Sequence, residues 1–91
     1  MTGIKFESKD GELYINGKAV KKVWESENGW FIFGIEKEDD KWFGVMRAKC
    51  IGGIISDWGH FSEQGIKYLE EEGVIWEIPQ GDLFFAVIRQ R

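Results

Sequence analysis

Cysteine, proline and histidine are scarce in this chain of 91 residues, which has one of each. The single cysteine, Cys50, cannot form an internal disulfide, and one cysteine with one histidine is too small a set for a zinc site. No apolar run approaches the roughly 20 residues that cross a bilayer, and the first residues hold no apolar core of secretory length. We therefore expect a cytoplasmic protein with no metal, no cofactor and no membrane contact.

Positive charge is also in short supply. The 12 Lys and Arg are outnumbered by 16 Asp and Glu, which gives a formal net charge of -4. Because phosphate contacts are made by clustered basic side chains, this balance argues against a general nucleic-acid binder. The hydrophobic share of 43% and the charged share of 31% are ordinary for a folded protein, and residues 1–91 are expected to form a single domain.

Aromatic side chains are abundant: there are seven Phe, five Trp and two Tyr. Three segments, 30–35, 42–46 and 83–88, are apolar at consecutive positions, so a strand in any of them must be covered on both faces. Three arrangements meet that demand: a sheet that curls on itself, two protomers packed sheet to sheet, or an aromatic face left open for a partner. We favour the curled sheet.

Asn-Gly and Asp-Gly dipeptides punctuate the first third of the chain and predict two-residue hairpin turns, because both central residues of such turns need positive φ. The dipeptides are Asp10-Gly11, Asn16-Gly17 and Asn28-Gly29. Strands are expected at about 3–8, 12–15, 18–27 and 30–36, and at 42–50 after a charged loop tip at 36–41. At Gly52 and Gly53 we expect the chain to bulge or to bend out of the sheet.

The helix is indicated by the residues at its start. Ser62 is predicted to be its N-cap, with Phe61 and Ile66 in the positions of a hydrophobic staple. Gly73 suits the position just past the last turn. The predicted helix covers about 62–72.

Two more strands, at about 74–78 and 83–89, are expected to form a C-terminal β-hairpin around a turn that contains Pro79. The predicted fold class is therefore α+β: an antiparallel β-meander, strongly curled or a partial barrel, with one helix followed by a hairpin.

Asp57, His60 and Ser62 have the side-chain types of a catalytic triad. Ser62 is better explained as a helix cap, and three residues within six positions rarely converge from one turn. We therefore expect no enzyme. His60 remains either a pH-sensitive group, since histidine has an ordinary pKa near 6.5, or a structural residue bonded to the backbone.

Tryptophan either fills the core or lines a surface on which a partner or a base stacks. Three glutamates at the negative end of the helix dipole form an acidic edge, either simply solvated or kept for a basic partner. The predicted binding residues are Trp30, Trp42, Trp58, His60, Trp76, Glu70, Glu71 and Glu72.

Residues 28–85 resemble a family of small domains of unknown function found in phage, plasmid and other mobile-element proteins. In that family an aromatic hairpin, here 29–31 through 42–44, precedes an acidic-Trp-Gly-aromatic-aromatic-Ser motif that leads into a helix. Residues 57–62 match this motif, with His60 where an aromatic is commoner, and 76–79 and 82–85 resemble the family's later part more loosely. The usual Arg before Asp82 is missing. The resemblance implies an accessory role in a mobile element and no mechanism.

Small size, negative charge, richness in tryptophan and the lack of a catalytic set favour a non-enzymatic protein-binding module. We interpret it as a phage or mobile-element accessory protein, including the case of an inhibitor of a host or defence protein. It would act through an aromatic surface rimmed with acid. A homodimer is an alternative use of the apolar surface. A second hypothesis is the binding of a nucleotide or single-stranded nucleic acid by stacked tryptophans, and a third is a small nuclease that uses carboxylates and a metal.

Overall fold

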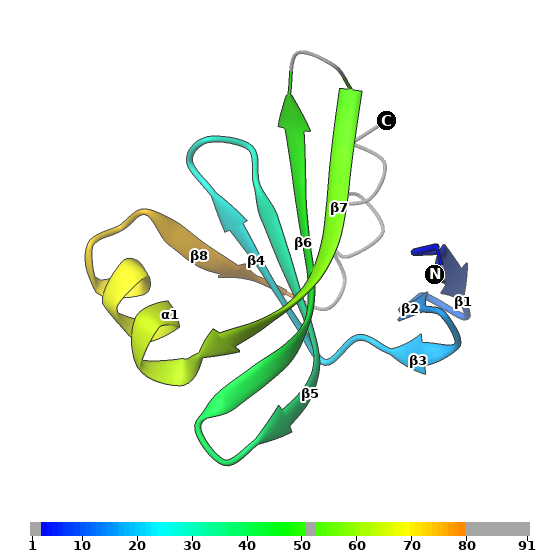
Figure 1. Ribbon diagram of the computed structural model, residues 1–91, viewed down its shortest axis with the longest axis horizontal. Helices are drawn as coiled ribbons and strands as arrows, with labels where there is room; N and C mark the ends of the chain where they lie inside the picture. Colours follow the sequence, from blue (N-terminus) through cyan, green and yellow to red (C-terminus); the bar gives the residue numbers. More distant parts are fainter. Residues whose placement is uncertain (1–2, 51–52, 80–91) are drawn as a thin grey trace.

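The computed structural model describes residues 3–50 and 53–79, which form two antiparallel sheets and one helix (Figure 1). The smaller sheet has the order β1-β2-β3 and the larger sheet the order β7-β6-β5-β4-β8. The helix α1 connects β7 to β8. The elements are β1 (Phe6–Lys9), β2 (Glu12–Ile15), β3 (Lys18–Ala19), β4 (Lys22–Ser26), β5 (Phe31–Glu38), β6 (Lys41–Cys50), β7 (Gly53–Ser62), α1 (Glu63–Glu71) and β8 (Ile75–Ile78).

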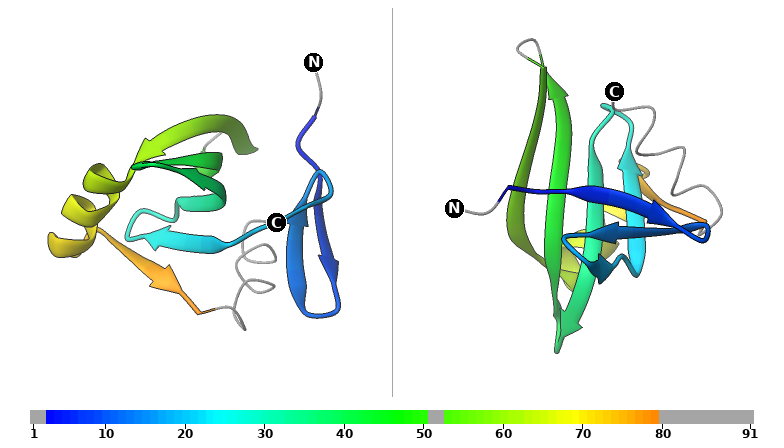
Figure 2. Two further views of the ribbon diagram at one scale, coloured as in Figure 1. Left: turned by 90° about the horizontal axis from the view of Figure 1, so that it is seen from below. Right: turned by 90° about the vertical axis from the view of Figure 1, so that its right-hand side faces the viewer.

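The predicted α+β class is confirmed, but the single β-meander is wrong. The expected strand at 18–27 is divided at Val20 and Lys21, and its two parts belong to different sheets. The larger sheet is strongly twisted and is not a closed barrel, because β7 and β8 lie at its two edges and do not pair with each other (Figure 2). The predicted strand at 83–89 lies outside the described residues.

The first two of the three predicted hairpin turns are confirmed, since both residues of each dipeptide have positive φ: 54° and 80° at Asp10-Gly11, 50° and 82° at Asn16-Gly17. The third is different. Only Gly29 has positive φ, at 83°, and its N–H donates to the carbonyl of Ser26 at 3.1 Å. The Ser26 N–H donates to the carbonyl of Trp30 at 2.8 Å and closes a loop of three residues, 27–29.

The strand β7 is the largest departure from the sequence prediction. Its ten residues pair with β6 from the Lys41↔Ser62 pair to the Cys50↔Gly53 pair, so the chain stays in the sheet after Gly53. The segment 57–62 is therefore the end of a strand and not a turn. Ile54 and Ile55 break the alternation of apolar and polar residues that would have indicated a strand with one exposed face.

The charged segment 36–41 is also more regular than expected. Only Asp39 and Asp40 form the turn, with Asp39 at φ 55°, and the residues on either side belong to β5 and β6.

Three glycines lie side by side across the larger sheet, where Gly44 pairs with Gly34 on one side and with Gly59 on the other. A Cβ atom on Gly44 would lie 1.8 Å from the carbonyl oxygen of Phe33, and one on Gly34 would lie 2.7 Å from the Trp42 ring. Only glycine fits at these two positions. Next to Gly34, a β-bulge shifts the register between β5 and β6.

The two faces of the larger sheet are covered by different elements. On one face the small sheet packs over a buried cluster, and on the other the helix packs over a second one; Figure 2 shows the small sheet and α1 on opposite sides. The first cluster contains Leu13, Ile15, Val20, Val23, Phe31, Phe33, Ile35, Val45 and Ile78, and the second contains Trp24, Trp42, Ile66 and Ile75. The chain's own N-terminal strands thus supply the second cover, which was not among the three arrangements expected from the sequence.

The predicted helix start and end are confirmed. The Oγ of Ser62 accepts a hydrogen bond from the Gly65 N–H at 3.0 Å, and Phe61 and Ile66 pack in the same apolar cluster. Gly73 follows the helix with φ 76°. At nine residues, the described helix is too short to cross a membrane.

Candidate functional site

Two of the five tryptophans are buried and three are exposed. Trp24 and Trp42 are 2% and 6% exposed and meet edge to face beneath α1, with ring centroids 5.6 Å apart. Trp42 was predicted to bind a partner, but its burial makes it inaccessible. Trp30, Trp58 and Trp76 are 45%, 36% and 44% exposed.

A partly exposed group of rings lies on the opposite face of β6 from Trp42: Trp58 and His60 are exposed and Phe43 is half-buried. Phe43, the next residue, stacks on the indole of Trp58 with ring centroids 5.4 Å apart and an interplanar angle of 5°. The ring of His60 lies 5.1 Å from Phe43 at 50°. The register explains this contact, because Phe43 pairs directly with His60 and diagonally with Trp58. We call Phe43, Trp58 and His60 the aromatic stack.

A hollow of about 540 Å³ borders the aromatic stack and is lined mainly by acidic residues. The bulge beside Gly34 brings Glu36 opposite Phe43, so acidic residues of β5 lie on the same face as the rings. Lys18 reaches in from the small sheet, with its Nζ 3.2 Å from Glu36 Oε1. The lining residues are Glu36, Glu38, Asp39, Asp40, Lys41, Phe43 and His60. We call this the acidic hollow; its four carboxylates outnumber the two lysines, Lys18 and Lys41.

The carboxylates of the acidic hollow are spread along a hairpin and do not converge on one point. Within residues 3–50 and 53–79, no group of three or more His, Cys, Asp or Glu side chains is arranged to hold a metal ion. The hollow therefore offers a diffuse negative surface beside flat rings.

The other exposed tryptophans lie elsewhere. Trp76 on β8 donates its Nε1–H to Glu25 Oε1 at 3.3 Å. Trp30 borders a separate, mostly apolar hollow of about 340 Å³ between the sheet and α1, with Ile32, Met46 and Leu69 among its lining residues. The predicted binding tryptophans are thus not brought together at one site.

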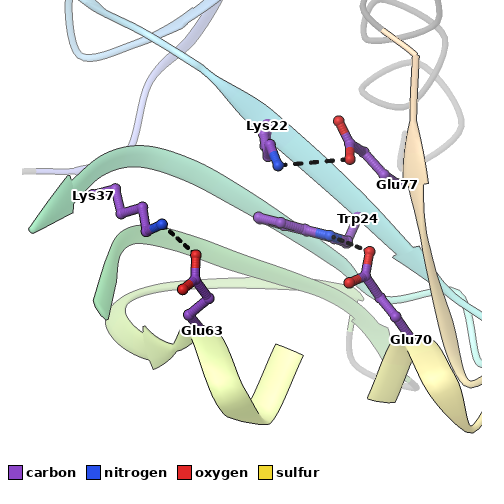
Figure 3. A network of polar contacts seen from close by, with 6 residues as sticks. All are labelled: Lys22, Trp24, Lys37, Glu63, Glu70 and Glu77. Carbon is purple, nitrogen blue, oxygen red and sulfur yellow. Dashed lines mark hydrogen bonds and ion pairs between the residues drawn. The ribbon is translucent and has the colours of Figure 1, made fainter. Parts of the chain in front are cut away.

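The three helix glutamates serve different roles. Glu70 Oε2 accepts the Nε1–H of the buried Trp24 at 3.2 Å, so this residue ties the end of α1 to the core (Figure 3). Glu71 and Glu72 are exposed, on a helix that covers the face opposite the aromatic stack. Glu70 thus has a structural contact that the sequence did not reveal.

Two ion pairs flank this contact in Figure 3: Lys22 with Glu77, at 3.8 Å between Nζ and Oε1, and Lys37 with Glu63. The hydrogen bond from Lys37 is the main cause that lowers the pKa of Glu63 below its ordinary value. Lys37 therefore attaches the start of α1 to β5.

Asp57, His60 and Ser62 do not assemble into a triad. Asp57 and His60 are three positions apart on β7, so their side chains leave opposite faces of the strand. Ser62 is occupied as the helix cap.

Phe43, Glu36 and Glu38 were not predicted from sequence as members of a site. The bulged pairing of β5 with β6 brings Glu36 opposite Phe43, and the pairing of β6 with β7 brings Phe43 next to Trp58 and His60; local patterns predicted neither the bulge nor the second pairing. The one indication in the sequence of an aromatic group on a second face was Phe43, because its side chain must point away from that of its neighbour Trp42 in an extended strand.

Comparisons with models of protein families, with the curated proteins and with the solved structures find no match to this chain. The resemblance to the mobile-element family therefore stays a prediction that rests on the motifs of the sequence.

Proposed function

We propose that this protein is a non-enzymatic binding module that holds a basic segment of a partner protein on the aromatic stack and the acidic hollow. The observation that carries the proposal is the exposed indole of Trp58, stacked in parallel on the half-buried Phe43 at the border of a hollow lined by four carboxylates. The resemblance to the mobile-element family adds an accessory role in a phage or plasmid to this proposal.

The chemistry of the surface favours a cation. A guanidinium or ammonium group is attracted to the face of an indole and, unlike a neutral apolar group, also gains from nearby carboxylates. Glu38 and its neighbours would attract a basic segment at a distance, and Trp58 would bind it at close range. Arginine suits both partners best, because its planar head group stacks and also donates to carboxylate oxygens.

A nucleotide or single-stranded nucleic acid is the weaker candidate. Its bases would stack on Trp58, but its phosphates would lie near Glu36, Glu38, Asp39 and Asp40. Like charges at such close range are unfavourable.

The test is a binding titration with a fluorescent peptide in which arginine alternates with threonine, followed by anisotropy at low salt. Trp58→Ala and Glu38→Lys are each expected to weaken binding about tenfold, equivalent to about 1.4 kcal/mol. Trp76→Ala removes a tryptophan that is somewhat more exposed than Trp58, and Glu71→Lys makes the same charge change as Glu38→Lys but on the helix. Both controls are expected to bind like the unchanged protein.

Two results would overturn the proposal. One is an absence of binding by the unchanged protein. The other is equal weakening by Glu38→Lys and Glu71→Lys, since that would mean that the peptide responds only to net charge.

A further inference from the structure

Within the part of the chain that the structure describes, the strand β7 is an open edge of the larger sheet. All ten of its residues pair with β6 with no shift of register, which keeps the strand regular along its length. Among the described residues, β7 pairs with no other strand. The outer side of such a strand presents unpaired N–H and C=O groups to which another extended chain can bind.

Among residues 3–50 and 53–79, the two edges of the sheet differ in protection. The edge strand β8 has only four residues, carries Glu77 in an ion pair, and is followed by Pro79. Short length, charge and proline are the usual features that keep an edge from pairing. In contrast, residues 55–62 of β7 contain no proline and one acidic residue, Asp57, and Ile55 is 54% exposed.

The open edge lies beside the aromatic stack. Trp58 and His60 are two positions apart on β7, so both point to the face that carries Phe43 and the acidic hollow. A strand added to β7 would run about 4.8 Å from it, and every second side chain of that strand would lie next to Trp58 or His60.

We infer that the partner segment binds as an extra strand on the open edge of β7, with basic residues at every second position facing Trp58 and His60. This inference rests on the proposed function and adds the mode of recognition: backbone hydrogen bonds hold the segment, and alternate side chains select it.

Charge identifies the occupant as a basic partner in preference to a second copy of this chain. Residues 55–62 contain no Lys or Arg, so a second copy paired on β7 would bring another Asp57 and no positive charge from this stretch to the edge. A segment with alternating Arg or Lys instead places cations next to Trp58 and His60, on the face that carries the acidic hollow, and complements the negative charge there.

The experiment compares the alternating arginine-threonine peptide with two N-methylated forms. One form is methylated at the backbone amides of the arginines and the other at those of the threonines, because successive amides of a strand point to opposite edges. One of the two forms is expected to bind about tenfold more weakly than the parent peptide and the other to bind like it. A peptide of the same composition with its arginines in one block is expected to bind more weakly than the parent.

Hydrogen exchange supplies a readout on the protein itself. Peptide binding is expected to slow amide exchange in β7 and to leave exchange in β8 unchanged.

If both methylated forms bind like the parent peptide and exchange in β7 is not slowed, strand addition is wrong. Binding that still depends on Trp58 would then leave the proposed function standing. If the parent peptide does not bind at all, the proposed function itself fails. Sedimentation of the free protein as a dimer that the peptide does not dissociate would make a second copy the occupant and would also overturn the inference.

Discussion

Two of the aromatic pairs in this protein start from neighbouring residues and have opposite environments. Trp42 packs against Trp24 in the core beneath α1, whereas Phe43 stacks on Trp58 at an exposed edge. Both begin on β6, whose successive side chains point to opposite faces. An aromatic residue thus becomes core or surface according to which element covers its face.

The small sheet and the helix cover different parts of the two faces of the larger sheet. The helix covers the Trp24–Trp42 pair and Ile75 of β8, and Ile66 is the buried residue that the helix contributes to this cluster. On the other face, the small sheet covers a cluster that includes Val45 but neither Phe43 nor Trp58. Among the described residues, the pair of Phe43 and Trp58, the open pair, therefore lies just past the border of the small sheet.

The largest expected effect comes from removing one ring from each pair. Trp42→Ala leaves a cavity in the core and is expected to lower the free energy of unfolding by about 3 to 5 kcal/mol. Trp58→Ala removes a ring that is already 36% exposed and is expected to cost about 1 kcal/mol, the loss of one stacked contact. Urea denaturation followed by circular dichroism measures both.

Trp42→Phe keeps most of the buried volume. It replaces Trp42→Ala in the comparison if Trp42→Ala does not fold. A cost for Trp58→Ala as large as that for Trp42→Ala would mean that the exposed pair is part of the core.

The next effect concerns the glycine row that lies between the two pairs. Gly44→Ala would place its Cβ 1.8 Å from the Phe33 carbonyl oxygen, and backbone atoms cannot yield cheaply, so we expect a loss of about 3 kcal/mol. Gly59→Ala is the matched control, because its nearest atom would be the Phe61 ring at 3.5 Å, an ordinary contact. It is expected to change stability by no more than about 0.5 kcal/mol.

Thermal unfolding of the two alanine variants checks this contrast. Equal losses at both positions would show that glycine is needed all along the row for its backbone and not for space.

Local features of the fold were predictable from sequence and long-range pairing was not. The cap at Ser62 and the two-residue turn at Asn16-Gly17 depend on residues close in the chain, and both were predicted. The stack of Phe43 on Trp58 depends on which strands pair and in which register. Nothing local distinguishes Trp42, which is buried, from Trp58, which is exposed, because each lies in an aromatic segment and only the cover over each differs.

A smaller effect is expected where β7 passes into α1. Ser62→Ala removes the hydrogen bond to the Gly65 N–H and should destabilise the protein by about 1 kcal/mol. Ser62→Asp keeps an acceptor at the cap and is the control. Because α1 covers only the Trp24–Trp42 pair, acrylamide should quench more tryptophan fluorescence in Ser62→Ala than in Ser62→Asp. Equal stability of the two variants would contradict the role of the cap.

The smallest effect is the pH dependence of the contact between α1 and β5. The hydrogen bond from Lys37 lowers the pKa of Glu63 in the folded protein below its ordinary value of 4.5, so the charged carboxylate stabilises the fold. This contribution is fully present above that value and is lost as the pH falls through the lowered pKa. The difference in unfolding free energy between the unchanged protein and Lys37→Met should therefore shrink on acidification, while Lys9→Met, a change on β1, should show no such trend.

Urea denaturation over a series of pH values measures this difference. A difference that stays constant with pH would mean that the aliphatic part of Lys37 matters and its charge does not. Both partners are more than one-third exposed, so solvent screens the pair and its effect is small. The helix must then be held over Trp24 and Trp42 mainly by the apolar side chains of Ile66 and Leu69. The covered pair therefore differs from the open pair in having these apolar contacts with a helix.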